Sequence, residues 1–159
     1  MRDLNEKVKI IEPSKEIFEI IRYYKKLVKA VLPKSKVTLI GSFAIPMCGK
    51  EEFDLLVEVK TDIKEVQGKV SKEGDGRFGI GPINDGEGFC RSKRRYGIIC
   101  ELHIVNPGHK KIKGYLDYVK RLKADPKFVK EFEELKRSLD GLPERVYKEK
   151  KLEFLNKYF

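Results

Sequence analysis

Cysteine is scarce in this chain, and its cysteines are not paired by spacing. There are three among 159 residues, and no two of them form a C-x-x-C motif. An odd count of this kind is typical of a reducing compartment and argues against a disulfide framework. A chain of this length can bury a core without such cross-links. We therefore expect one domain over residues 1–159, held together by packing.

Long apolar runs are also missing. No stretch approaches the roughly 20 residues that a membrane-spanning helix needs, and the N-terminal segment MRDLNEKVKI lacks a hydrophobic signal core. The glycine-rich segment 74–88 does not have the Walker spacing, which excludes a P-loop. The sequence predicts a cytoplasmic protein with no membrane partner.

Negative charge is outweighed, and the excess of positive charge lies mainly in one part of the chain. The net charge is +10, and residues 106–159 carry 15 basic and 9 acidic side chains. Such an excess attracts phosphates or nucleic acid through non-specific charge. No RNA- or DNA-binding motif accompanies it. A solvated, Lys-rich helical surface is therefore the simpler interpretation, and the oligomeric state stays open.

Hydrophobic spacing predicts an α/β (α+β) arrangement, with helices at both ends and strands between them. Apolar residues recur every three to four positions in the helical segments and form short β-branched runs in the strands. Thr61 is the expected cap of the second helix. The expected helices are 14–31, 61–70, 110–123, 126–139 and 143–157, and the expected strands are 37–40, 53–59, 77–80, 87–92 and 96–105.

The chemically distinctive feature is a Gly-Ser pair after the first of these strands, followed by an aspartate on the next. Gly41 lets backbone N–H groups approach a phosphate closely, and the Ser42 hydroxyl adds a hydrogen-bond donor. Asp54 can hold a divalent metal ion that bridges phosphate oxygens. The sequence predicts that Gly41-Ser42 ends one strand and that Asp54 lies on its immediate neighbour in the sheet.

This pattern resembles the signature of the nucleotidyltransferase superfamily, and its surroundings are similar to the GrpB family. The resemblance rests on IGSFAIP at residues 40–46, Lys50, FDLLVEV at 53–59, LHIV at 102–105 and the C-terminal Tyr…Lys…Phe helix. It covers about residues 36–159. It implies a nucleotidyltransferase-like mixed sheet with an N-terminal helix and a C-terminal helical cluster.

The resemblance and the residues together indicate a candidate site for Mg²⁺ or Mn²⁺ and a nucleoside triphosphate. Asp54 and Glu101 are the candidate metal ligands, and His103 shares the strand face of Glu101. The candidate catalytic residues are Asp54, Glu101 and His103, and the candidate nucleotide-binding residues are Gly41, Ser42, Lys50, Arg91 and Lys93.

Each candidate also has a simpler interpretation. His103 could be a packed, hydrogen-bonded strand residue, Glu101 an ion-paired edge carboxylate, and the basic residues around Arg91 and Lys93 a charged turn that protects a sheet edge. Cys100 and His103 lie on opposite faces of their strand, so they do not form a zinc-ligand pair.

Departures from the family pattern leave two functions open. Phe43 stands where the family has a small hydroxyl residue, residues 47–49 and the Lys50-Glu51 dipeptide differ from its loop, and Leu56 replaces the second carboxylate of the superfamily. One hypothesis is a metal-dependent nucleotidyltransferase-like enzyme that transfers a nucleotidyl group to an unknown acceptor. The alternative is a non-catalytic nucleotide- or nucleic-acid-binding module on a degenerate scaffold.

Overall fold

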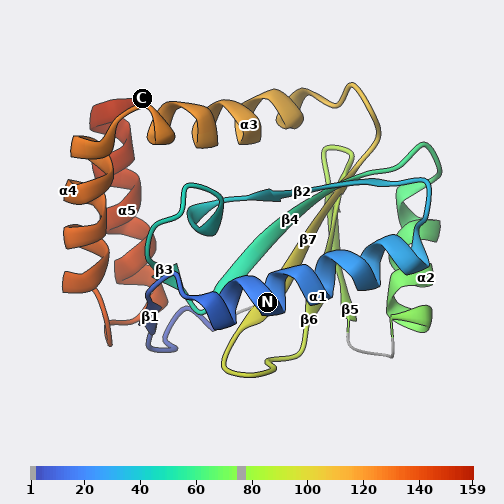
Figure 1. Cartoon of the computed structure of the whole chain (residues 1–159), viewed down its shortest axis with the longest axis horizontal. Helices are drawn as coiled ribbons and strands as arrows, with labels where there is room; N and C mark the ends of the chain where they lie inside the picture. The colour runs from blue at the N-terminus through green and yellow to red at the C-terminus, as the bar shows by residue number, and fades with distance from the viewer. Residues whose placement is uncertain (1–2, 75–77) are drawn as a thin grey trace.

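The computed structural model of the chain describes residues 3–74 and 78–159, and in this part the strands lie mostly in the first two thirds of the chain and three consecutive helices follow them (Figure 1). The helices of this part are α1 (Lys15–Val31), η1 (Ser42–Ala44, a 3-10 turn), α2 (Ile63–Glu73), α3 (Lys110–Lys123), α4 (Pro126–Ser138) and α5 (Glu144–Tyr158). The strands are β1 (Ile10–Ile11), β2 (Lys36–Ile40), β3 (Gly49–Lys50), β4 (Glu52–Glu58), β5 (Phe78–Asn84), β6 (Glu87–Ser92) and β7 (Ile99–Val105).

The main sheet is mixed, in agreement with the sequence prediction. Its strand order is β2-β4-β7-β6-β5, and β1 pairs separately with β3. The central pair, β4 and β7, is parallel, whereas β2, β5 and β6 pair antiparallel with their neighbours. Because β4 and β7 are paired and parallel, each residue of one strand lies beside the residue in register with it on the other.

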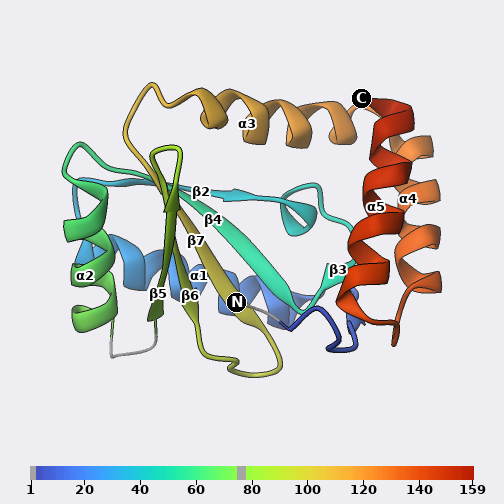
Figure 2. The same ribbon diagram turned by 180° about the vertical axis from the view of Figure 1, so that it is seen from behind.

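Helices cover both faces of this sheet, and α4 and α5 stand together at one end of it (Figures 1 and 2). Phe53, Leu55 and Val57 of β4 pack with residues of α1 and α2 in the largest core cluster. Leu56 points to the opposite face and packs with residues of α3. Side chains alternate along β4, so one set packs under α1 and α2 and the other set, which includes Asp54 and Leu56, lies on the face under α3.

Local sequence signals explain where the helices begin. Ser14 caps α1, since its hydroxyl accepts a hydrogen bond from the backbone N–H of Ile17, 3.2 Å away. The predicted cap of α2 was wrong: Asp62, not Thr61, is the N-cap, and its carboxylate accepts from the backbone N–H of Glu65. An aspartate carboxylate is the better acceptor at a helix N-terminus because it also meets the helix dipole favourably.

Two strands differ from their predicted ranges by more than one residue, one at its start and one at its end, and both differences lie at turns. The strand expected from Tyr96 begins only at Ile99, because Tyr96 and Gly97 have φ values of 53° and 78° and form a turn. The strand expected over 77–80 extends from Phe78 to Asn84, and Arg77 lies outside the described residues. Left-handed backbone conformations of this kind interrupt a strand ladder.

The C-terminal helices match their predicted ranges closely. Pro126 occupies the first turn of α4, and Pro143 is the N-cap that precedes α5 rather than its first helical residue. In the described part of the chain, none of the helices combines the length and the apolar character that crossing a bilayer requires.

Candidate functional site

The β2 strand ends directly beside the Asp54 carboxylate. Ile40, the last residue of β2, pairs with Asp54 on β4. Gly41 then turns the chain with φ 76°, a conformation that favours glycine. A Cβ atom on Gly41 would lie 2.9 Å from Oδ2 of Asp54, which is closer than such atoms approach without a shift. Glycine therefore lets the backbone pass against the carboxylate, with Ser42 next in the chain, as the sequence predicted.

Two carboxylates and an imidazole converge on the neighbouring strands. Asp54 and Glu101 occupy paired positions on β4 and β7. His103 follows Glu101 by two residues and therefore shares its strand face. Nε2 of His103 lies 2.9 Å from Oδ1 of Asp54 and 3.7 Å from Oε1 of Glu101. One ligand atom from each of the three residues lies within 4.8 Å of the others.

The imidazole of His103 lies between two acidic residues. Its Nδ1 is 3.8 Å from Oε1 of Glu87, and its Nε2 contacts Asp54. Burial alone would lower the pKa of His103, but the hydrogen bonds to Asp54 and Glu87 raise it to about 10. His103 is therefore an imidazolium at neutral pH and donates a hydrogen bond to Asp54.

A half-buried tyrosine completes this network. The hydroxyl of Tyr115 on α3 donates to Oε2 of Glu87 at 2.6 Å and lies 3.3 Å from Nδ1 of His103. Glu87 is 1% exposed, and Lys111 approaches its other oxygen at 3.4 Å. Residues from β6, β7 and α3 thus fix the orientation of the His103 ring, and through it that of the Asp54 carboxylate.

Glu101 is held from the other side by Arg91 of β6. Nη1 of Arg91 lies 3.4 Å from Oε2 of Glu101, and its Nη2 lies 3.2 Å from Oε2 of Glu52. Burial, and next the nearby charge of Asp54, raises the pKa of Glu101 above its usual range. Two carboxylates that repel each other at close range are a common setting for a bound cation.

A pocket of about 320 Å³ opens beside this group. It lies between the end of β2, the sheet face of β4 and β7, and helices α3 and α5. The residues that line it are Ile40, Gly41, Ser42, Asp54, His103, Gly114, Tyr115, Tyr118 and Lys151. We refer to it below as the site pocket.

Three of the candidate nucleotide-binding residues do not line the site pocket: Arg91, described above, and the two lysines, Lys50 and Lys93. Lys50 is bound by Glu144 at 2.6 Å and by Glu52 at 3.0 Å, and its ammonium lies over the ring of Tyr147. Burial would lower the pKa of Lys50, but these carboxylates raise it overall. Lys93 is exposed and lies just beyond the end of β6. Lys50 therefore ties β3 to α5, away from the pocket.

Leu56 occupies the position where the superfamily pattern has a second carboxylate. Its side chain is fully buried and packs with Ile40 and Val105. In the strand register it lies beside His103. Of the β4 carboxylates on this face, Glu52 is bound by Lys50 and Arg91, and Asp54 is the one that lines the pocket, so Glu101 of β7 is the candidate for the second ligand.

The sequence analysis did not identify two lysines at the site. Lys151 of α5 lines the pocket, and burial lowers its pKa. Lys136 of α4 is fully buried, and its Nζ lies 2.8 Å from Oγ of Ser42. The sequence does contain a pattern that places Lys136 in the interior, because Phe128, Phe132 and Lys136 recur every four residues along the buried face of α4.

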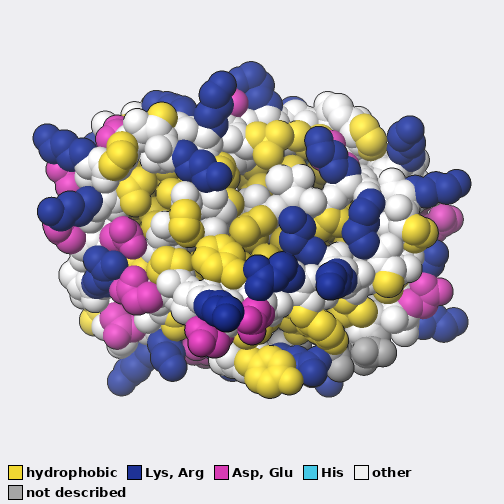
Figure 3. All heavy atoms as spheres, in the orientation of Figure 1, with side chains coloured by type: hydrophobic (Ala, Val, Ile, Leu, Met, Phe, Trp, Pro, Cys, Tyr) yellow, Lys and Arg dark blue, Asp and Glu magenta, His cyan; other side chains and the backbone are white. Residues whose placement is uncertain are grey.

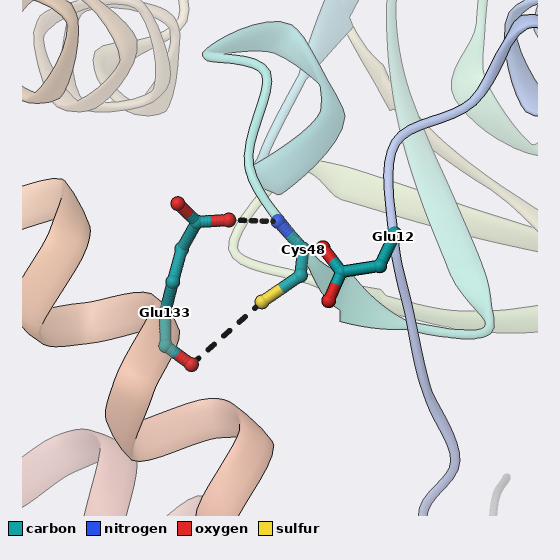
Figure 4. A group of neighbouring side chains, drawn as sticks. All are labelled: Glu12, Cys48 and Glu133. Carbon is teal, nitrogen blue, oxygen red and sulfur yellow. Dashed lines mark hydrogen bonds between the residues drawn. The ribbon is translucent and has the colours of Figure 1, made fainter.

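A second group of potential metal ligands consists of Glu12, Cys48 and Glu133 (Figure 4). The backbone N–H of Cys48 donates to Oε2 of Glu133 at 3.0 Å, and Arg137 donates to both carboxylate oxygens of Glu12. Burial raises the pKa of the Cys48 thiol to about 11, so it stays protonated at neutral pH. This group is a structural clamp between the N-terminal segment, the loop and α4.

The fold is nucleotidyltransferase-like. The Cid1 poly(U) polymerase with Mg 3′-dATP bound superposes with a TM-score of 0.57 and 14% identity, over 75% of this chain and 40% of that one. Terminal uridylyl transferase 4 from Trypanosoma brucei with bound GTP has a TM-score of 0.50 and 13% identity, over 72% and 40%. The chain thus spans about two fifths of these enzymes, and the likeness concerns the fold.

The chain belongs to the GrpB family, because residues 7–159 match the family described as GrpB protein. The match begins well before residue 36, so it includes the N-terminal helix as well. The conserved protein GrpB from Enterococcus faecalis has a TM-score of 0.67 and 20% identity, with 94% of this chain and 98% of that chain covered. No curated protein sequence matches the chain.

Proposed function

We propose that this protein binds a nucleoside triphosphate together with one divalent cation, Mg²⁺ or Mn²⁺, in the site pocket and transfers its nucleotidyl group to an acceptor. The observation that carries the proposal is the pairing of Asp54 with Glu101 across β4 and β7, directly beside the Gly41-Ser42 turn. Two structures of similar fold, the Cid1 poly(U) polymerase with MgGTP and with Mg 3′-dATP bound, support a nucleotide as the ligand.

The donor set suits a single hard cation. Asp54 and Glu101 are partly exposed, with 29% and 23% of their side chains accessible, so an ion could reach both. Mg²⁺ and Mn²⁺ prefer carboxylate oxygens, and phosphate oxygens or water complete their coordination. Nε2 of His103 contacts Oδ1 of Asp54 at 2.9 Å, so this side chain can hold the Asp54 carboxylate in its orientation toward the ion. Leu56 leaves no place for the carboxylate that a second ion would need.

The residues around the pocket suit the phosphate chain. Gly41 and Ser42 line the pocket, where glycine adds no side chain, and Lys151 brings a basic group from α5. Arg91 is engaged with Glu101 and therefore acts by holding this carboxylate in place. When bound, the cation would supply positive charge at the phosphates, while Lys151 stabilises the negative charge of the departing pyrophosphate.

Turnover can be tested by the release of pyrophosphate from each of the four common nucleoside triphosphates, with Mg²⁺ or Mn²⁺ and a panel of RNA and small hydroxyl acceptors. We expect release with at least one nucleotide, and its loss in Asp54→Asn, which removes the charge but keeps the shape. Lys93→Met, at an exposed residue outside the pocket, is the matched control and should retain activity. Equal turnover in Asp54→Asn and the wild type would contradict the proposal.

A second candidate function is favoured by the burial of Leu56. A site with one carboxylate on β4 could bind nucleotide or nucleic acid without catalysis. Lys and Arg side chains are scattered over the face in Figure 3, at its edge and nearer its middle, instead of forming a single stripe, so any nucleic-acid binding should be weak and fall steeply with salt. Mg²⁺-independent nucleotide binding without turnover would favour this binding module over the enzyme.

A further inference from the structure

The part of the site pocket that α3 forms carries no charged side chain. α3 runs beside β2 and ends at α4 and α5 (Figures 1 and 2). Its three pocket-lining residues are Gly114, Tyr115 and Tyr118. The charged groups of the pocket come instead from β4, β7 and α5. Because the proposed function places the cation and the phosphates at those groups, α3 is left to meet the uncharged part of the nucleotide.

Gly114 makes this part of the pocket unusually open. It lies in the interior of α3, where glycine is the least favourable residue after proline. A Cβ atom at this position would meet nothing within 4 Å, so no close neighbour demands a glycine. The effect of glycine here is to leave space free along the pocket wall, one helical turn before Tyr118.

Tyr118 supplies a fixed aromatic ring beside this space. It follows Gly114 by four residues and therefore lies on the same side of α3. Its ring stacks on that of Phe159, with 6.0 Å between the ring centres and 16° between the planes, and it packs against the apolar cluster around Phe132. Burial, and next the charge of Asp54, raises the pKa of Tyr118, so its hydroxyl is a donor at neutral pH.

The two tyrosines of this wall differ in what their hydroxyls do. The hydroxyl of Tyr115 already donates to Glu87 at 2.6 Å. That of Tyr118 takes part in no hydrogen bond to another residue in the described part of the chain. The α3 wall therefore offers a ligand open space, an aromatic surface and a single hydroxyl. A flat, uncharged ring with a few polar atoms at its edge matches this set.

We propose that the base of the bound nucleotide lies over Gly114 against the ring of Tyr118, and that the open space at Gly114 limits the size of what binds there. Stacking of a base on an aromatic side chain tolerates every base. A single hydrogen bond from Tyr118 changes affinity by up to about tenfold. We therefore expect the four common nucleoside triphosphates to bind within about tenfold of one another. This inference rests on the proposed function for the position of the phosphates.

A leucine at position 114 tests the open space. Calorimetric titrations compare ATP with inorganic tripolyphosphate, which has no base, each with Mg²⁺. Gly114→Leu should weaken ATP binding by about 5–100-fold, the usual worth of one stacked base, and leave tripolyphosphate unchanged. Gly68→Leu is the matched control, because Gly68 also lies inside a helix with nothing within 4 Å of its Cβ position but outside the pocket, and it should bind both ligands as the wild type does. Unchanged ATP binding in Gly114→Leu, or an equal loss of both ligands, would overturn the inference.

Further variants of α3 separate the ring from its surroundings. Tyr118→Leu removes the ring but keeps an apolar side chain, and it should weaken ATP by about 5–100-fold without affecting tripolyphosphate. Tyr118→Phe should lose at most about tenfold. Gly114→Ala should bind ATP as the wild type does and melt at a higher temperature, since alanine favours a helix. Circular dichroism and a cooperative thermal transition establish that each variant is folded, and the Gly114 variants decide the question if Tyr118→Leu is not.

Free nucleosides separate this inference from the proposed function. Saturation-transfer NMR in the presence of chelator should show contacts between the wild type and the base protons of a nucleoside at millimolar concentration, and Gly114→Leu should abolish them. These contacts in a protein whose nucleotide binding ignores Mg²⁺ would support the base site and contradict the proposed function. Mg²⁺-dependent binding of ATP that is the same in Gly114→Leu, Tyr118→Leu and the wild type would overturn the base site and leave the proposed function standing. A protein that binds neither nucleosides nor nucleotides would overturn both.

Discussion

Replacing Leu56 by aspartate restores the carboxylate that the superfamily pattern has at this position, and the structure predicts a loss of stability as the first result. The leucine side chain is fully buried between β4 and α3. Removing a leucine of this kind costs about 2–5 kcal/mol in other proteins. A carboxylate in its place must also leave water, which the neighbouring imidazolium of His103 only partly offsets. We expect Leu56→Asp to lower the free energy of unfolding by about 3–5 kcal/mol.

The response of stability to metal ions should then show whether the charge or the shape of the new side chain at position 56 matters. Leu56→Asn removes the same apolar contacts without adding a negative charge, so it should be destabilised without a response to cations. In Leu56→Asp, a cation held by Asp54 and Glu101 gains a third carboxylate, so millimolar Mn²⁺ should recover part of the lost stability. Urea unfolding of the wild type and both variants, with Mn²⁺ and with chelator, measures this. Wild-type stability of Leu56→Asp in chelator, or equal recovery of both variants by Mn²⁺, would refute the reasoning.

Three further perturbations probe the surroundings of the site. Gly41→Ala should lower the free energy of unfolding by more than the about 1–2 kcal/mol that the left-handed conformation costs an ordinary residue, because the new Cβ atom would meet Asp54. Gly97→Ala, with a similar φ of 78° and nothing within 4 Å, is the control, and equal losses in the two variants would refute the contact. Tyr115→Phe removes the donor to a buried carboxylate of β6 and should cost about 1–3 kcal/mol in urea unfolding; no change would show that water replaces the hydroxyl. Since the pKa of Lys136 is lower in the folded than in the unfolded state, the wild type should gain stability relative to Lys136→Met as the pH rises toward the unfolded pKa of about 10.4; a constant difference would mean that the amine is charged in the fold.

The helices and the central strand pair were predictable because their signals are local. Ser14 and Pro126 mark helix starts by rules that depend on a few neighbouring residues. The alternation of side chains along β4 and β7 was enough to expect Asp54 and Glu101 on one face once the strands were taken as neighbours. These parts of the site needed no knowledge of distant packing.

The rest depended on contacts between segments far apart in the chain. The two-residue strands β1 and β3 exist only because they pair with each other, so no periodicity announces them. Lys136 was read as part of a charged helical surface, although its spacing from Phe132 placed it on the buried face. Lys50 was expected at the phosphates, but Glu144 from α5 binds it instead. Net charge and spacing do not show which carboxylate a lysine will meet in the fold.

The most direct test of the account is a calorimetric titration of ATP and the other nucleoside triphosphates into the wild type and Asp54→Asn, each with Mg²⁺ and with chelator. The account predicts binding to the wild type that is markedly tighter with Mg²⁺, and an Asp54→Asn variant that is folded but does not respond to the ion. It also predicts at most one weakly held Mn²⁺ per chain when no nucleotide is present, since Asp54 and Glu101 are its only carboxylate ligands among the described residues. Two tightly held ions without nucleotide, or the same Mg²⁺-dependent binding in Asp54→Asn, would contradict it.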